Sequence, residues 1–443
     1  MPHPLSRRTA LLAVFAAPLG GCSLYEDIFG KEKPRLPGTR VAVQDARPGL
    51  LSENTARSIT PPPPGAIPEA PQAGATPAHP GGHMVLRDTP SVAWSSSIGT
   101  GGGARRKLTA PPIIAGGRVY TMDSDGRVAA FDAGTGAQAW RVPTEPKDDR
   151  STNIGGGIGL DAGVLYAATG RAELLAMNPA DGAVIWRQKL PTPARSAPTI
   201  ADGRIYLTTL DDQVIAFAPA DGKRLWAHQG PAAETTILGL PAPAVADGLV
   251  VVGFSSGELR ALRTTSGSVV WADTLGSVTA RANSLGEIAA IRGLPAIVGA
   301  RVYAGSLGGL ATSIDLRSGR RLWERDIYAG EMLWPAGDWL FLVSADAIVA
   351  AISRLDGTVA WATQFDRWEN MEKTRDAITW FGPVLAGNRA WVAGSQGLML
   401  SLDASTGTIL SRTKLSSAAA MAPVLAGGAM YVITEDGTIT CYR

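Results

Sequence analysis

The sequence predicts an all-β protein, an eight-bladed β-propeller with four-stranded blades. First, a strand–turn–strand unit recurs; its clearest copy is residues 131–140, where an apolar run is followed by Asp-x-x-Thr-Gly and then Trp. Second, from Trp140 to Trp361 the tryptophans of successive copies are 46, 40, 45, 52 and 38 residues apart. Third, the two ends of the repeat region are incomplete in complementary ways. Repeats of 40–50 residues with four strands each are typical of propeller blades.

The turn of the unit explains its composition. Asp132 can accept hydrogen bonds from the backbone amides of the turn, and Gly136 can adopt the positive φ that the turn needs. Trp140 follows on the next strand, where a large flat ring can fill the gap between packed sheets.

Seven complete units follow one another. Their last strands carry Trp140, Trp186, Trp226, Trp271, Trp323 and Trp361, and the seventh carries Ser411 at the same position. Because these tryptophans recur with a regular period, we interpret them as packing between blades rather than as ligand-stacking groups.

The eighth blade is predicted to be a composite of both ends of the repeat region. Residues 91–98, with Trp94, resemble the last strand of a blade that lacks its other three. Residues 422–442 supply three strands and lack the fourth. Pairing the two closes the ring and removes open sheet edges.

Composition excludes one class of partner. The chain has 443 residues, with 41 Lys and Arg against 39 Asp and Glu, so a nucleic-acid-binding surface is not expected. The 52 glycines and 31 prolines suit a turn-rich β protein.

The N-terminus reads as an export signal over residues 1–21. Arg7 and Arg8 precede an apolar stretch, which ends in Leu19-Gly20-Gly21-Cys22. This ending resembles the bacterial lipobox, which implies that Cys22 is lipidated. An ordinary signal peptide with an incidental cysteine is the alternative.

Residues 22–88 are expected to form a Pro-rich, disordered tether, and residues 89–443 the propeller. The tether segment has few large apolar residues, so it cannot bury enough surface to offset its ordering entropy. His79 and His83 lie here without a third ligand, and no metal site is expected.

Two connections are longer than the repeat requires, residues 276–294 and 365–380. Long loops on a rigid scaffold are where binding usually occurs. A short helix packed over the ring is the alternative.

The sequence shows no constellation that indicates catalysis or a cofactor. The glycine clusters at 101–103 and 155–157 do not continue into a phosphate-binding loop. Asp123–Gly126 begins like a calcium loop without its later glutamate, and a hairpin turn explains it. We therefore predict no catalytic residue, no metal and no cofactor.

The repeated unit resembles the tryptophan-docking motif of propellers related to quinoprotein alcohol dehydrogenases. The lipobox, the tether, the eight blades and the terminal strand closure together resemble the BamB family of outer-membrane assembly lipoproteins. The sequences of residues 316–323 and 436–439 are also similar to that family. This resemblance implies a non-catalytic scaffold, lipid-anchored at the periplasmic face of the outer membrane. It implies docking onto the periplasmic (POTRA) domains of BamA and contact with other BAM lipoproteins and, as a further option, with unfolded outer-membrane proteins.

By the same resemblance, the contact loops are residues 235–239 and 287–292. The implied contact residues are Thr235, Ile237, Leu238, Glu287, Ala290, Ile291 and Arg292. Two other functions stay open. A pyrroloquinoline-quinone-dependent dehydrogenase would need a calcium site, a catalytic aspartate and commonly two adjacent cysteines. A periplasmic propeller that binds a small ligand or the cell wall would use its axial funnel.

Overall fold

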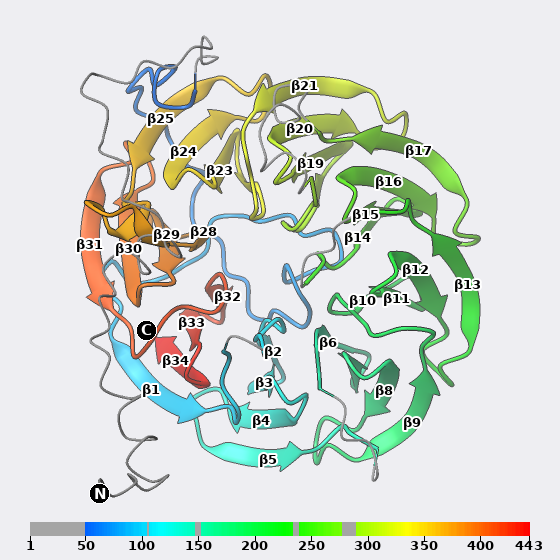
Figure 1. Ribbon diagram of the computed structural model, residues 1–443. Helices are drawn as coiled ribbons and strands as arrows, with labels where there is room; N and C mark the ends of the chain where they lie inside the picture. Colours follow the sequence, from blue (N-terminus) through cyan, green and yellow to red (C-terminus); the bar gives the residue numbers. More distant parts are fainter. Residues whose placement is uncertain (1–48, 104–105, 147–151, 234–238, 277–288) are drawn as a thin grey trace, which may run out of the picture. The chain divides into compact units, whose positions relative to one another are not determined.

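Eight four-stranded antiparallel sheets form a ring around a central axis, which confirms the predicted fold (Figure 1). The computed structural model describes residues 49–103, 106–146, 152–233, 239–276 and 289–443. The signal peptide and Cys22 lie outside these residues. No helix long and apolar enough to cross a membrane is found in the part of the chain so described.

Each blade runs from an inner strand at the axis to an outer strand at the rim, and in six of the eight blades the inner strand has only three residues. Blade 1 contains β2 (Ile113–Ala115), β3 (Arg118–Met122), β4 (Val128–Asp132) and β5 (Gln138–Val142). Blade 2 contains β6 (Gly156–Asp161), β7 (Val164–Thr169), β8 (Glu173–Met177) and β9 (Val184–Lys189). Blade 3 contains β10 (Thr199–Ala201), β11 (Arg204–Thr208), β12 (Gln213–Phe217) and β13 (Arg224–Gln229). Blade 4 contains β14 (Ala244–Ala246), β15 (Leu249–Gly253), β16 (Glu258–Arg263) and β17 (Val269–Thr274).

The second half of the ring repeats this order. Blade 5 contains β18 (Ala296–Val298), β19 (Arg301–Gly305), β20 (Leu310–Asp315) and β21 (Arg321–Asp326). Blade 6 contains β22 (Trp334–Ala336), β23 (Trp339–Val343), β24 (Ile348–Ser353) and β25 (Val359–Gln364). Blade 7 contains β28 (Trp380–Ala386), β29 (Arg389–Gly394), β30 (Leu398–Asp403) and β31 (Ile409–Lys414).

Blade 8 is the composite blade. It combines β32 (Val424–Ala426), β33 (Ala429–Thr434) and β34 (Thr438–Tyr442) with β1 (Val92–Ser97) as its outer strand. β1 runs antiparallel to β34, with Ser95 opposite Thr440 and Trp94 opposite Cys441. The predicted closure by the two ends of the repeat region is confirmed.

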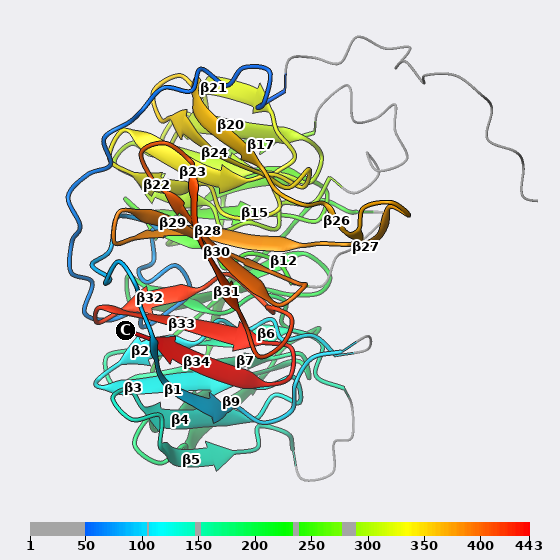
Figure 2. The same cartoon turned by 90° about the vertical axis from the view of Figure 1, so that its left-hand side faces the viewer.

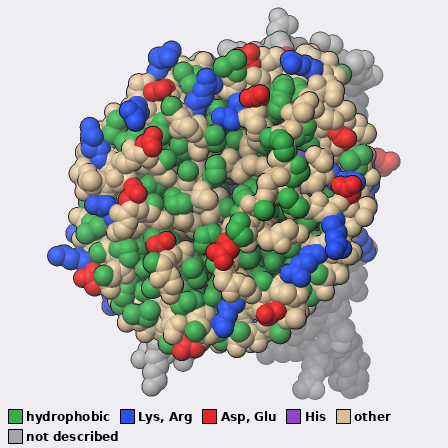
Figure 3. Space-filling view, turned by 180° about the vertical axis from the view of Figure 1, so that it is seen from behind, with side chains coloured by type: hydrophobic (Ala, Val, Ile, Leu, Met, Phe, Trp, Pro, Cys, Tyr) green, Lys and Arg blue, Asp and Glu red, His purple; other side chains and the backbone are tan. Residues whose placement is uncertain are grey.

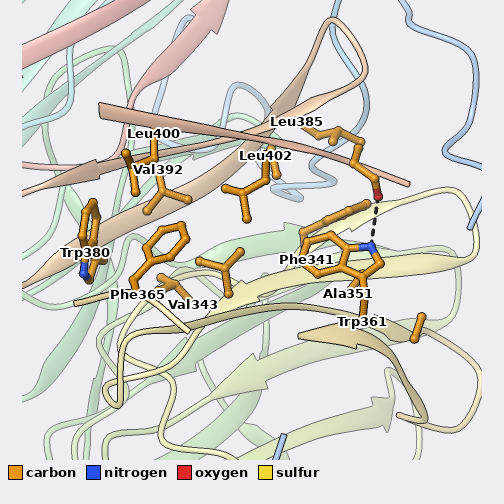
Figure 4. Close-up of a cluster of buried hydrophobic side chains, with 14 of the residues drawn as sticks. Phe341, Val343, Ala351, Trp361, Phe365, Trp380, Leu385, Val392, Leu400 and Leu402 are labelled. Atoms are coloured by element: carbon orange, nitrogen blue, oxygen red, sulfur yellow. Dashed lines mark hydrogen bonds between the residues drawn. The ribbon is translucent and has the colours of Figure 1, made fainter. Parts of the chain in front are cut away.

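Burial follows the position of each strand within its blade. Strand β12 is buried along almost its whole length, whereas the outer strand β13 is mostly exposed, with Trp226 as its one buried residue. The apolar clusters lie between adjacent blades. The cluster between blades 6 and 7 contains Phe341, Trp361 and Leu402 (Figure 4). The ring is therefore held together by side-chain packing across its blade-to-blade contacts.

The tryptophans join each blade to the next one. Each indole Nε1 donates to a backbone carbonyl in the turn between the third and fourth strands of the following blade, at 2.7–3.1 Å; the seven residues are Trp94, Trp140, Trp186, Trp226, Trp271, Trp323 and Trp361. The ring lies over the turn glycine, so a Cβ atom on Gly407 would come within 2.4 Å of Trp361. These glycines have φ between 70° and 78°, a range that disfavours other residues.

The exception at Ser411 has a structural reason. Its neighbour is the composite blade, whose third and fourth strands, β34 and β1, are far apart in the sequence and are not joined by a turn. A tryptophan at 411 would have no glycine turn to cover. Ser411 Oγ instead shares a hydrogen bond of 2.6 Å with Ser401 Oγ in its own blade.

Residues 49–88 differ from the expected tether because they pack against the propeller. Thr55 and Arg57 bond to Ala360 in β25, and this outer strand is more buried than its counterparts in other blades. The chain then crosses one face of the ring to the axis, where Ala70, His79 and Met84 are buried. The ordering comes from backbone hydrogen bonds and from small side chains that fit the narrow axis, which a criterion based on large apolar residues does not detect.

A hairpin follows β25 in place of the short helix considered from the sequence. β26 (Trp368–Asn370) pairs with β27 (Arg375–Ala377) and projects from the ring (Figure 2). At its base Phe365 and Trp380 meet edge to face, with ring centroids 4.8 Å apart.

Candidate protein-docking site

The connections from the outer strand of each blade to the inner strand of the next open on one face of the ring, here called the loop face. Residues 49–88 lie along the opposite face, here called the plug face, while β26 and β27 project from the loop face (Figure 2). Figure 3 views the plug face, where apolar side chains are spread over the centre of the ring. Only residue 239 of the first loop implicated by the sequence and residues 289–292 of the second are described, and they lie in the connections between blades 3 and 4 and between blades 4 and 5.

The first of these loops is anchored at its base by a buried polar network. Thr235, Ile237 and Leu238 lie outside the described residues. Just after them, the Leu240 amide donates to the Arg195 carbonyl at 3.1 Å. The Arg195 guanidinium, 2 % exposed, donates from Nη1 to Ser255 Oγ at 3.1 Å.

This network crosses from blade 3 to blade 4. Ser255 Oγ donates to an Asp212 carboxylate oxygen at 3.1 Å. Burial lowers the pKa of Arg195, and the Asp212 charge opposes that shift. Burial also raises the pKa of Asp212, against the Ser255 hydrogen bonds. Arg195 is thus a positioning residue for the segment that carries the loop.

The second loop ends in the buried contact between blades 4 and 5. Glu287 lies outside the described residues, whereas Ala290 and Ile291 are fully buried. The Ile291 amide donates to the Phe254 carbonyl at 3.1 Å, and its side chain lies against Gly253. Direct contact of Ile291 with a partner, which the resemblance implied, does not fit this buried position. Its β-branched side chain fills the contact between blades 4 and 5.

Arg292, in the same loop, is partly exposed. Its Nη2 lies 2.7 Å from Glu331 Oε1, and its guanidinium lies 5.6 Å from the centre of the Phe381 ring. The other Glu331 oxygen accepts from the Gly382 amide at 3.4 Å. Burial raises the pKa of Glu331, against the attraction of Arg292. The contact connects the segments before blades 5 and 6 to β28 of blade 7.

Arg292 and Glu331 also line the axial funnel, a cavity of about 570 Å³. Its walls come from segments that lead into the inner strands, including Leu240 and Leu294, and from Phe381 in β28. Its floor contains Ala70, Ala73 and Met84 from the N-terminal segment. Such an apolar cavity with few charged groups can hold an apolar group that arrives from the loop face.

Two residues of this site were missed from the sequence, Arg195 and Glu331. The available signal was a charged residue between small apolar ones just before an inner strand, as in Pro193-Ala194-Arg195-Ser196-Ala197. Charge so near a propeller axis must be paired or hydrogen-bonded, so it marks a polar network.

The histidines of the N-terminal segment are engaged by backbone groups. His79 Nδ1 lies 2.9 Å from the Pro295 carbonyl, and His83 Nε2 accepts from the Asn388 amide at 2.9 Å. Burial lowers the pKa of His79 to about 4. Across the residues that the structure describes, no group of three or more His, Cys, Asp or Glu side chains could hold a metal ion.

Comparison with known proteins identifies a family. A family model described as outer membrane protein assembly factor BamB matches residues 124–363 and 366–442. The BamB of Salmonella typhimurium is 30% identical over 356 residues, which cover 79% of this chain and 88% of that protein. The BamB of Escherichia coli K12 is matched at the same identity and coverage.

Solved structures share the fold. The BamB of Moraxella catarrhalis superposes with a TM-score of 0.69 at 20% identity, over 80% of this chain and 100% of that one. A quinohemoprotein alcohol dehydrogenase from Comamonas testosteroni superposes with a TM-score of 0.64 at 14% identity, over 85% of this chain and 80% of that one.

Proposed function

This chain belongs to the BamB family of outer membrane protein assembly factors, and from that premise we propose that it is a non-catalytic docking scaffold of the BAM complex. The observation that carries the proposal is family membership over most of the ring: the family model matches residues 124–363 and 366–442. The partners are the periplasmic POTRA domains of BamA and the other BAM lipoproteins. Unfolded outer-membrane proteins are a further candidate partner.

The proposed location is the periplasmic face of the outer membrane. Residues 1–21 would direct export and be removed, and lipid on Cys22 would anchor the mature chain. Residues 23–48 would then be the tether, a shorter one than the sequence alone suggests, because residues 49–88 pack on the ring.

Within the docking surface, each implicated residue has a distinct proposed part. Ile237 and Leu238 would be apolar anchors, with Thr235 and Glu287 as polar contacts beside them. Arg292 would contact the partner at the edge of the funnel, where the Glu331 pair holds its guanidinium in place. Ala290 and Ile291 would act through the loop by fixing its end between the blades.

The test is affinity capture of the tagged full-length protein from gently solubilised envelopes, with identification of the co-purifying proteins. We expect BamA and other BAM lipoproteins. A double variant, Ile237→Glu with Leu238→Glu, should reduce BamA recovery at least tenfold. Ile185→Glu is the matched control, because Ile185 is an apolar residue on the outer strand of blade 2 that is 59% exposed.

Three outcomes are informative. Loss of BamA in the double variant with retention in the control supports the assigned loop. Equal recovery in both variants removes the loop assignment and leaves the scaffold role. Repeated capture without BamA, from envelopes where the complex is otherwise intact, refutes the scaffold role itself.

A further inference from the structure

Residues 67–84, here called the plug, contact the inner strands of all eight blades in their order around the ring. The plug carbonyls of Ile67, Pro71, Pro77 and Ala78 accept from the amides of Gly427, Leu160, Val245 and Ile297, in blades 8, 2, 4 and 5, at 2.7–2.8 Å. Ala70 exchanges two hydrogen bonds of 2.8 Å with Ile114 in blade 1. Gln72 Oε1 accepts from the Ile200 amide in blade 3 at 2.9 Å. The Gly82 and Met84 amides donate to Pro335 and Leu385 in blades 6 and 7, at 2.7 and 2.9 Å.

These contacts satisfy groups that the ring cannot satisfy by itself. In every blade the inner strand is an edge strand, because it pairs with one neighbour only. Its other side faces the axis, with backbone N–H and C=O groups unpaired by the sheet. The plug supplies partners for such groups in each blade. It therefore binds mainly through backbone hydrogen bonds, the way an added strand binds a sheet edge.

The plug fills the opening of the central channel on the plug face, here called the axial mouth. The composition of the plug matches the width of this mouth. Gly81 packs so closely on blade 6 that a Cβ atom would come within 2.5 Å of the Pro335 carbonyl oxygen. Gly74 is covered by the His79 ring, which is fully buried. Ala70 and Ala73 are buried as well. Larger side chains would not fit at these positions, so a peptide rich in Ala, Gly and Pro, with turns at residues 72–78, is the ligand class for this mouth.

We propose that the axial mouth on the plug face is a peptide-binding site and that residues 67–84 are its ligand, held in cis. The bound plug closes this mouth, so the axial funnel opens only on the loop face. The site is independent of the docking role assigned above.

The experiment separates the ligand from its site after folding. A protease recognition sequence is placed at residues 87–90, between the plug and β1, where Arg87, Asp88 and Thr89 are exposed. The full-length protein is folded, cleaved and passed over a size-exclusion column. The N-terminal fragment is expected to co-elute with the ring, and a labelled peptide of residues 64–86 should exchange into the cleaved protein. A scrambled peptide of the same composition should not.

Two variants isolate the contribution of the plug from that of residues 49–59. Gly81→Val places its side chain against Pro335, at a φ of 64° that also disfavours valine, and should release the fragment at least tenfold faster after cleavage. Gly49→Val is the matched control, because no atom lies within 4 Å of its added Cβ. Immediate release of the unmodified fragment, equal binding of the scrambled peptide, or a Gly81→Val fragment as slow to leave as the control would each overturn the proposal.

Discussion

Replacing Trp361 with alanine tests how the blades hold together. Trp361 is 1% exposed and lies in the cluster between blades 6 and 7, beside Phe341 at 6.0 Å between ring centroids. Its Nε1 donates to the Ala404 carbonyl at 3.1 Å (Figure 4). The substitution empties this contact and leaves the Ala404 carbonyl without that donor.

The expected loss of unfolding free energy is about 4 kcal/mol, because buried Trp→Ala substitutions cost roughly 3–5 kcal/mol. An unfolding entropy of about 2.1 cal/mol/K per residue, over a ring of roughly 350 residues, converts this loss into a Tm lower by about 5 °C.

The assay is thermal and urea unfolding followed by near-ultraviolet circular dichroism. Trp368→Ala is the control, because Trp368 lies on the projecting hairpin and is partly exposed. This control should lose less than about 1 kcal/mol. A Trp361→Ala protein as stable as the control would refute the view that indole docking joins the blades.

Two further predictions concern the turns. Gly407→Ala should cost about 2 kcal/mol more than Gly163→Ala, since both glycines have φ near 75° but only Gly407 faces an indole ring; equal losses in urea unfolding would contradict this. Hydrogen bonds from the hydroxyls of Thr135 and Ser318 lower the pKa of Asp132 and Asp315, so their stabilisation is present above pH 4 and is lost as the pH falls through the lower folded-state pKa. The stability gap between the native protein and the Asp132→Asn, Asp315→Asn variant should therefore narrow from pH 4 to pH 2 in Tm measurements, and a constant gap would show that these carboxylates do not contribute.

The ring was predictable because the residues that specify each turn and each blade contact lie close together in the sequence and recur from unit to unit. Each Asp, Gly and Trp in a unit defines one turn and one contact, and eight repeats make the period visible. The composite blade followed from counting strands at both ends of the repeat region, and β1 indeed pairs with β34.

The plug was not predictable from composition. Ala70, Gly74 and Gly81 are small because the axis is narrow, yet the same residues are typical of disordered tethers. What orders them is backbone hydrogen bonding to strands hundreds of residues later in the chain. The local hydrophobicity pattern of the sequence does not reveal such pairing.

The docking site was predictable only as a pair of loops. The pattern around Ile291 is apolar and β-branched, which suits a partner anchor and a core residue equally well. Only the packing against Gly253 decides between them. Arg195 shows the opposite case, because a charge among small residues gives no indication of the Ser255 and Asp212 groups that meet it.

The composite blade also sets the order in which the protein can fold as the chain is delivered from its N-terminus. Ser95 and Thr440, which share a hydrogen bond, are 345 positions apart. Delivery from the N-terminus supplies β1 first and β34 last, so β1 stays unpaired while seven blades form. Pairing over such a separation is slow because the loop-closure entropy comes first. The plug, which needs the inner strands of all the blades, can complete its contacts only when the last strand has arrived. Chaperones or proteases therefore encounter a nearly complete ring whose first strand is unpaired and whose axial mouth is still open.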